Sequence, residues 1–177
     1  YLQIYYFKIK KNIIYPTIYT NFNNKKFCLQ VSFIRNRNNI NNKILNNINK
    51  LKSIGNIDTI KLHKSKINDV SCYHSEKLLN LFNNYKFILC FENSYTKGYI
   101  TEKIFNGFFS KSIPIYTGPS DINRYINKDS YIDLLNINTN QITNLMNNED
   151  KYNNFLKINK ICNFDDENYI IKSNQFI

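Results

Sequence analysis

Apolar positions change their spacing along this chain, and the changes predict strands that alternate with helices. Residues 27–33 alternate apolar and polar side chains, which is typical of a strand. Residues 36–53 instead repeat isoleucine and leucine every three or four positions, as one face of a helix does. A second strand is expected at 56–62. A helix follows at 75–84, where Ser75 is a plausible N-cap.

The run Lys86–Phe91 (KFILCF) is almost wholly apolar, which favours a central parallel strand buried on both faces. The remaining elements expected after it are a polar loop at 92–98, a helix at 100–110, a strand at 112–116, a short helix at 121–126, a strand at 131–134 and a mostly helical stretch at 139–161. Strands alternating with helices predict an α/β fold built on a doubly wound parallel sheet. Ligands in such sheets bind at the carboxyl ends of the strands, here after Phe91 and Tyr116.

Composition adds little to this picture. The net charge of +11 favours anionic partners such as nucleotides, nucleic acids or acidic membrane. The basic residues are scattered without forming a stripe, however, and the abundance of lysine, asparagine, isoleucine and tyrosine indicates a general compositional bias. No apolar run reaches the roughly 18–20 residues that span a bilayer, so we expect no transmembrane segment here and any anchor upstream. Cys28 and Cys90 lie in apolar runs and are expected to be buried free thiols.

The loop after Phe91 carries the candidate chemistry. Asn93 offers a donor and an acceptor, Tyr99 an aromatic face and a hydroxyl, and Glu102 and Lys103 open the next helix. A helix N-terminus with an adjacent lysine binds phosphate, and a carboxylate holds sugar hydroxyls. This combination suits a sugar diphosphate, although a Thr-Glu-Lys helix start is also common as an ordinary cap with a surface pair.

The segment Tyr85–Gly118 resembles the signature of glycosyltransferase family 10, the α-1,3/4-fucosyltransferases. It carries F-E-N-S at a strand end, then Y-I-T-E-K, a helix and an I-P-I-x-x-G turn, in the family's order and spacing. The resemblance implies a GT-B fold of two Rossmann-like lobes, with GDP-fucose held mainly by the C-terminal lobe. It divides the chain into a linker or end of the acceptor lobe (1–25), the donor lobe (26–135) and a helical tail (136–177).

Site residues follow from the same resemblance. Asn93, Tyr99, Glu102 and Lys103 match donor-binding positions. Lys103 would balance the diphosphate. Glu102 would face the fucose and stabilise an oxocarbenium-like transition state.

A phosphate-clamping arginine is also implied, and either Arg37 or Arg35 fits it, with Arg37 matching slightly better. Gly118 would close the turn that faces the donor. The family's general base is a carboxylate of the acceptor lobe, and residues 1–25 contain no Asp, Glu or His, so none is assigned. The chain alone is therefore expected to bind donor without transferring fucose.

The implied reaction is an inverting transfer of L-fucose from GDP-β-L-fucose to a hydroxyl of a glycan acceptor, most simply with α-1,3 linkage. No D-x-D motif is present, and the acidic cluster Asp165–Glu167 follows no expected strand, so no metal is required, although divalent ions stimulate some family members. The family implies the Golgi membrane for a eukaryotic source.

Three alternatives stay open. One is another GT-B nucleotide-sugar transferase, against which the F-E-N-S to T-E-K pairing argues. A second is a non-catalytic basic module, for example for nucleic acid, but no nucleic-acid motif is present. The third is a fragment that folds without catalysing.

Overall fold

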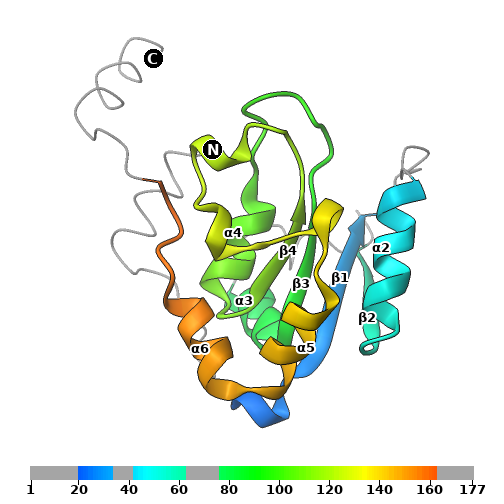
Figure 1. Ribbon diagram of the computed structural model, residues 1–177, viewed down its shortest axis with the longest axis vertical. Helices are drawn as coiled ribbons and strands as arrows, with labels where there is room; N and C mark the ends of the chain where they lie inside the picture. The colour runs from blue at the N-terminus through cyan, green and yellow to red at the C-terminus, as the bar shows by residue number, and fades with distance from the viewer. Residues whose placement is uncertain (1–19, 34–41, 63–75, 163–177) are drawn as a thin grey trace.

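The computed structural model describes residues 20–33, 42–62 and 76–162, and within these ranges it holds one sheet of five parallel strands (Figure 1). Their order across the sheet is β2-β1-β3-β4-β5. The strands are β1 (Lys26–Phe33), β2 (Ile57–Leu62), β3 (Tyr85–Phe91), β4 (Ile113–Thr117) and β5 (Ile132–Asp133). Each neighbouring pair is parallel, which confirms the predicted α/β class.

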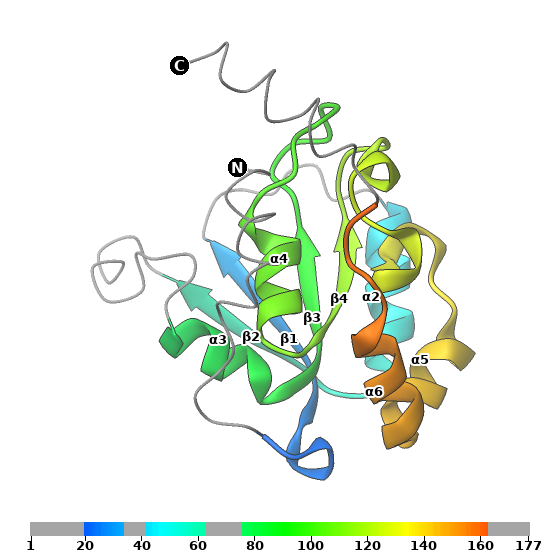
Figure 2. The same ribbon diagram turned by 90° about the vertical axis from the view of Figure 1, so that its left-hand side faces the viewer.

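Helices cover both faces of this sheet (Figures 1 and 2). They are α2 (Asn42–Lys52), α3 (Glu76–Asn83), α4 (Glu102–Phe109), α5 (Thr139–Asn147) and α6 (Glu149–Lys157). Apolar side chains of α3 and α4 share one core with the sheet, while those of α2, α5 and α6 share the other. Two cores on opposite faces are what a doubly wound sheet requires.

Strand β3 runs through the middle of the sheet, which explains why its sequence is apolar except for Lys86. All seven of its residues are buried. Phe87 and Leu89 face the core under α2 and α5, whereas Ile88 and Cys90 face the core under α3 and α4, because successive side chains of a strand alternate. The thiols of Cys28 and Cys90 are buried and unbonded to another cysteine, as predicted.

Several predicted boundaries move in the structure. The stretch expected as one helix at 139–161 forms two, because Asn148 ends α5 and its side chain caps α6 by accepting from the Lys151 amide at 2.9 Å. The segment expected as a short helix at 121–126 is a single 3-10 turn, η3 (Ile122–Arg124). The described part of the helix expected at 36–53 begins at Asn42. Ser75, the predicted N-cap, lies outside the described residues.

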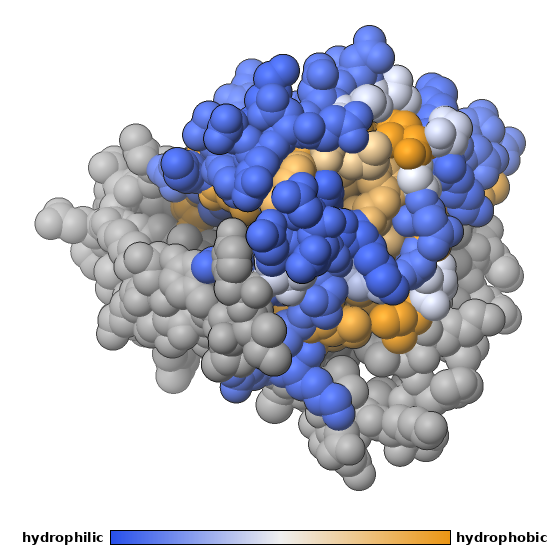
Figure 3. Space-filling model, turned by 90° about the horizontal axis from the view of Figure 1, so that it is seen from below, coloured by the Kyte–Doolittle hydropathy of each residue, from blue (hydrophilic) through white to orange (hydrophobic). Residues whose placement is uncertain are grey.

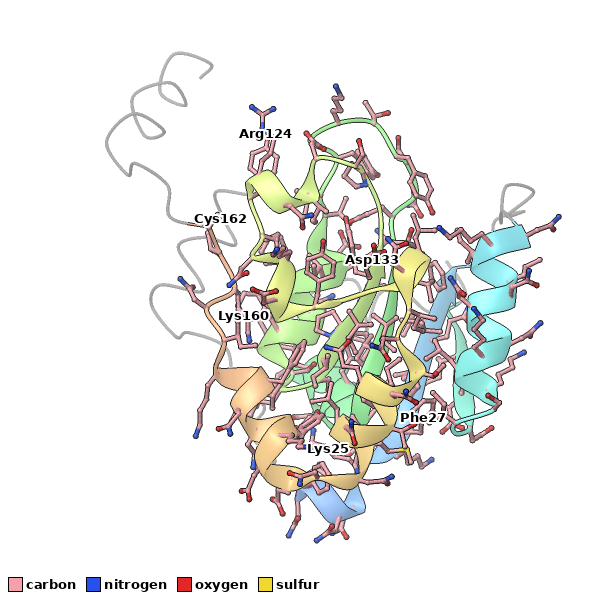
Figure 4. All side chains as sticks on the ribbon, in the orientation of Figure 1. Lys25, Phe27, Arg124, Asp133, Lys160 and Cys162 are labelled. Atoms are coloured by element: carbon pink, nitrogen blue, oxygen red, sulfur yellow. The ribbon has the colours of Figure 1, made fainter. Side chains whose placement is uncertain are left out.

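At the amino ends of the strands, the side chains of Phe22 and Lys25, which precede β1, pack against the end of the sheet. The ammonium of Lys25, labelled in Figure 4, donates to the Asn83 carbonyl at the end of α3 and to the Lys111 carbonyl just after α4. The ammonium of Lys86 lies 3.6 Å from the centre of the Phe22 ring. Seen from this end, the described surface is mostly polar, with apolar residues showing between the polar ones (Figure 3).

Candidate functional site

The strand order places the switch point of the sheet, where the chain reverses its direction across the sheet, between the carboxyl ends of β1 and β3. The chain runs from β1 outward to β2 and then returns to the other side of β1 as β3, so the connections after β1 and β3 leave the sheet toward opposite faces. In doubly wound sheets, ligands bind at this switch point. The loop of residues 92–100, which follows β3, and the turn after β4 lie together at this end (Figure 1).

The buried carboxylate of Glu92 joins the three segments that meet there. Glu92 directly follows β3, and its Oε1 accepts from the Thr101 amide at 2.9 Å and from the Tyr116 hydroxyl at 3.3 Å. Its Oε2 accepts from the Thr101 hydroxyl at 2.6 Å. Burial raises the pKa of the Tyr116 hydroxyl, and the Glu92 carboxylate raises it further. Glu92 therefore fixes the start of α4 and the end of β4 to the end of β3.

Helix α4 begins without the usual side-chain cap. Thr101 occupies the N-cap position in extended conformation, but its hydroxyl makes no capping bond with the helix; it donates to Glu92 and accepts from the Lys103 ammonium. The first amides of a helix carry the positive end of its dipole and require partners from outside the helix. Such an N-terminus at the carboxyl edge of a parallel sheet suits an anionic ligand.

Glu102 and Lys103, both predicted site residues, are in contact with each other. The Lys103 ammonium donates to Glu102 Oε1 at 3.1 Å and to Thr101 Oγ1 at 2.9 Å, and it lies 3.6 Å from Glu92 Oε2. Burial alone would lower the pKa of Lys103, but the carboxylates of Glu102 and Glu92 outweigh it and the net pKa is raised. Lys103 is thus held charged.

The charge around Lys103 is not that of a lone cation. Two carboxylates flank one ammonium, so the cluster of Glu92, Glu102 and Lys103 carries one net negative charge when all three are ionised. The side chains of Lys103 and Glu102 are only 16% and 11% exposed. A diphosphate at this place would therefore draw on the helix amides and on further basic groups besides Lys103.

The other two predicted residues, Asn93 and Tyr99, lie on the loop between β3 and α4. Asn93 is exposed directly after Glu92, and Tyr99 is 38% exposed just before the helix. All four predicted residues therefore belong to one loop and one helix start. Arg35 and Arg37 lie outside the described residues. Arg124, on η3, is exposed and reaches outward at the same end of the molecule (Figure 4).

Two hydrogen bonds tie the middle of this loop to the last residue of β4 and to the segment after it. The Gly98 amide donates to Asp121 Oδ1 at 3.0 Å, and Gly98 has a φ of 76°, a backbone conformation that favours glycine. The Tyr95 hydroxyl lies 3.2 Å from Thr117 Oγ1. The loop is therefore shaped from both ends before any ligand binds.

Gly118, expected to be structural, occupies a position where no side chain fits. A Cβ added there would lie 2.2 Å from the Tyr116 hydroxyl oxygen, 2.6 Å from Tyr116 Cζ and 2.9 Å from Glu92 Cγ. Tyr116 and Glu92 are both buried, so neither can easily withdraw. Glycine here lets the backbone pass over the Glu92–Tyr116 contact.

The sequence profile "Glycosyltransferase family 10 (fucosyltransferase) C-term" matches residues 9–174, which is nearly the whole chain. The chain belongs to glycosyltransferase family 10. The resemblance drawn from Tyr85–Gly118 is thereby confirmed.

Individual relatives of this family-10 chain match over shorter stretches. A putative fucosyltransferase of Acanthamoeba polyphaga mimivirus is 42% identical over 77 residues, covering 44% of this chain and 12% of the relative. An alpha-(1,3)-fucosyltransferase of Helicobacter pylori is 39% identical over 62 residues, covering 35% and 13%. A human 4-galactosyl-N-acetylglucosaminide 3-alpha-L-fucosyltransferase is 41% identical over 68 residues, covering 37% and 19%. The matched stretches span less than a fifth of these curated relatives.

Solved structures confirm the fold. An alpha1,3-fucosyltransferase crystal structure superposes with a TM-score of 0.62 at 24% identity, covering 82% of this chain and 41% of that one. The structure of an alpha1,3-fucosyltransferase with GDP-fucose gives a TM-score of 0.58, also at 24% identity, with 82% and 42% covered. The family-10 chain thus shares the architecture of slightly less than half of each.

Glu92 and Asp121 are the residues that sequence reasoning missed. From the sequence, Glu92 was noted only as part of the F-E-N-S motif, and Asp121 only as the first residue of an expected helix. A carboxylate directly after an almost wholly apolar strand was the available signal for Glu92, because a charge at a buried strand end requires partners. No local signal pointed to Asp121, since its partner Gly98 lies 23 positions earlier.

No group of three or more His, Cys, Asp or Glu side chains in ranges 20–33, 42–62 and 76–162 is arranged to hold a metal ion. Among the helices of the same ranges, none is long and apolar enough to cross a bilayer.

Proposed function

We propose that this family-10 chain binds GDP-fucose as the donor lobe of an α-1,3-fucosyltransferase. The reaction is an inverting displacement in which an acceptor glycan hydroxyl attacks the anomeric carbon of GDP-β-L-fucose and GDP leaves, which gives an α-linkage. One observation carries the proposal. The family signature forms a loop and helix start at the sheet's switch point, where Glu102 and Lys103 meet beside the N-terminus of α4.

Each predicted residue takes a role that its surroundings support. The amides at the start of α4 and the charged Lys103 face the diphosphate, because both present positive charge at the same helix end. Glu102 faces the fucose, where its carboxylate stabilises the positive charge that develops at the anomeric carbon. Asn93 and the partly exposed ring of Tyr99 contact the nucleotide or sugar from the loop.

A clamping arginine would complete the charge balance. The cluster of Glu92, Glu102 and Lys103 has no net positive charge, so a diphosphate requires cations from elsewhere. Arg35 and Arg37 follow the last residue of β1 by two and four positions, and β1 borders the switch point. We assign the clamp to one of these two, with Arg37 preferred.

The wider setting of the lobe is also a proposal. We divide the chain into a linker or end of an acceptor lobe (1–25), a donor lobe (26–135) and a helical tail (136–177), although side chains of α5 and α6 pack into the sheet's second core. The general base is assigned to the acceptor lobe. The acceptor is a glycan of a glycoprotein or oligosaccharide, divalent metal is at most stimulatory, and the Golgi membrane is the expected location for a eukaryotic source.

Saturation-transfer NMR with GDP-fucose tests this function on the chain itself. We expect guanine, ribose and fucose methyl protons all to receive saturation from the protein, since both ends of the donor lie against it. UDP-galactose at equal concentration serves as the control and should receive much less. Absence of transfer to GDP-fucose would contradict the proposal. Saturation of the guanine without the fucose methyl would contradict the sugar-facing role of Glu102.

A further inference from the structure

Glu92 is the most deeply buried carboxylate of the candidate site, and hydrogen-bond donors surround its carboxylate oxygens. Its side chain is fully buried, and its oxygens receive the Thr101 amide, the Thr101 hydroxyl and the Tyr116 hydroxyl, with the Lys103 ammonium 3.6 Å away. A buried carboxylate is costly unless donors compensate it. A purely structural junction of strand and helix does not require a charge at this position, since a neutral acceptor could receive one amide.

The arrangement around Thr101 shows how Glu92 reaches the reactive groups. The Thr101 hydroxyl donates its one proton to Glu92, so its lone pairs are turned toward other donors, and one of them receives the Lys103 ammonium at 2.9 Å. Lys103 in turn donates to Glu102 at 3.1 Å. A chain of hydrogen bonds therefore runs from Glu92 through Thr101 and Lys103 to Glu102.

We propose that Glu92 is a positioning residue of the donor site, which orients Lys103 and, through it, Glu102 toward the bound nucleotide sugar. This inference rests on the proposed donor-binding function. Glu92 itself touches no substrate, since none of its side chain is exposed. It acts by fixing the Thr101 acceptor and by holding one side of the ammonium with its negative charge.

Glu92→Gln isolates this role because it keeps the size of the side chain. The three donors to Glu92 then face an amide whose NH₂ group repels one of them. The Thr101 hydroxyl can adapt by reversing its proton, but it then no longer presents the same acceptor to Lys103. We expect the affinity for GDP to fall about 5–10-fold while the fold persists.

A double-mutant cycle with Lys103→Met separates positioning from stability. If Glu92 acts through Lys103, Glu92→Gln should change GDP affinity less than twofold once Lys103 is replaced. Tyr116→Phe is the matched control, because it removes a hydrogen bond to the same carboxylate without touching Lys103. It should leave the coupling between Glu92 and Lys103 intact and lower thermal stability only.

Isothermal titration of GDP into the wild-type chain and these variants, with thermal unfolding in parallel, is the experiment. The inference is overturned if Glu92→Gln weakens GDP equally in both Lys103 backgrounds, leaves the affinity unchanged, or tightens binding as simple removal of a negative charge would. A wild-type chain that does not bind GDP would overturn the proposed function as well, and that result is distinct from any of these three.

Discussion

The Glu92 carboxylate receives both the amide and the hydroxyl of Thr101, at 2.9 and 2.6 Å, and so closes the loop of residues 92–100 at its base. The same carboxylate accepts from the Tyr116 hydroxyl at the end of β4. One buried group thereby sets the spacing between the two strand ends and the first turn of α4. Lys103 and Glu102, which we assign to the diphosphate and the fucose, lie in this first turn, next to the junction.

Lys103→Met should weaken GDP by about 1.5–3 kcal/mol, the loss of a charge-assisted contact to phosphate. The loss should be equal for GDP and GDP-fucose because both carry the diphosphate. Titration calorimetry measures it, and Lys151→Met, an exposed lysine in the first turn of α6, is the control. Unchanged GDP affinity in a folded Lys103→Met protein would leave Lys103 a structural partner of the two glutamates.

Glu102→Gln should slow fucose transfer about 10²–10³-fold in an enzyme with both lobes. Its effect on GDP affinity should be far smaller, because an amide oxygen at this position still accepts from Lys103. The carboxylate is proposed to act as charge develops on the sugar, so its effect belongs to the transition state. Transfer from radiolabelled GDP-fucose is the measurement. Glu149→Gln, which also alters the first residue of a helix, is the control. Wild-type turnover by Glu102→Gln would refute the role.

Gly118→Ala should destabilise the fold by about 1–3 kcal/mol, because the new methyl group would overlap the buried Tyr116 ring and its hydroxyl. Urea unfolding monitored by circular dichroism measures the change. Adding Tyr116→Phe removes the nearest atom, 2.2 Å from the added Cβ, and should recover part of the loss. If the double variant is less stable than the sum of the single changes predicts, the steric explanation is wrong.

Stability should rise with pH between about 7 and 9 because of Lys25. Burial lowers the pKa of Lys25 to about 7, with help from Lys111 and Lys86, while the unfolded chain keeps the ordinary value of about 10.4. The unfolded state therefore binds more protons in this window, so the free energy of unfolding increases with pH, by about 2 kcal/mol from Lys25.

Urea unfolding at pH 7 and pH 9 checks this dependence. Lys25→Met should flatten the increase, although part will remain because burial also lowers the pKa of Lys160 to about 8. The matched control is Lys26→Met, which changes the next residue of the chain, whose side chain is 66% exposed. A wild-type slope of zero, or one that Lys25→Met leaves intact, would contradict the assignment.

The sequence predicted the sheet well because its strongest signals are local. The apolar run of β3 and the periodicity of the flanking helices both follow from which of their faces are buried. A strand buried on both faces has a nearly continuous apolar sequence, so it can be recognised from the sequence alone. Predicted boundaries failed where a single polar side chain decides them. Asn148, for example, caps α6 and so divides a stretch that periodicity alone reads as continuous.

The sequence predicted where four of the candidate residues lie in the fold, but not their electrostatics. Sequence spacing brought Asn93, Tyr99, Glu102 and Lys103 onto one loop and helix start, where the structure places them. Spacing could not show that Glu92 turns inward to share Lys103 with Glu102, since that contact depends on how the loop closes in three dimensions. Long-range ties such as Gly98 to Asp121 are invisible to local patterns for the same reason.

The central claim, that this chain is a GDP-fucose donor lobe, is tested most directly by comparing nucleotides in one titration series. Isothermal titration of the chain with GDP, UDP and CDP should give clear binding of GDP and far weaker binding of the two pyrimidine nucleotides. Phosphate contacts are common to all three, so the difference reports on the base and not on the net charge of +11. Equal affinity for GDP and UDP would contradict the account.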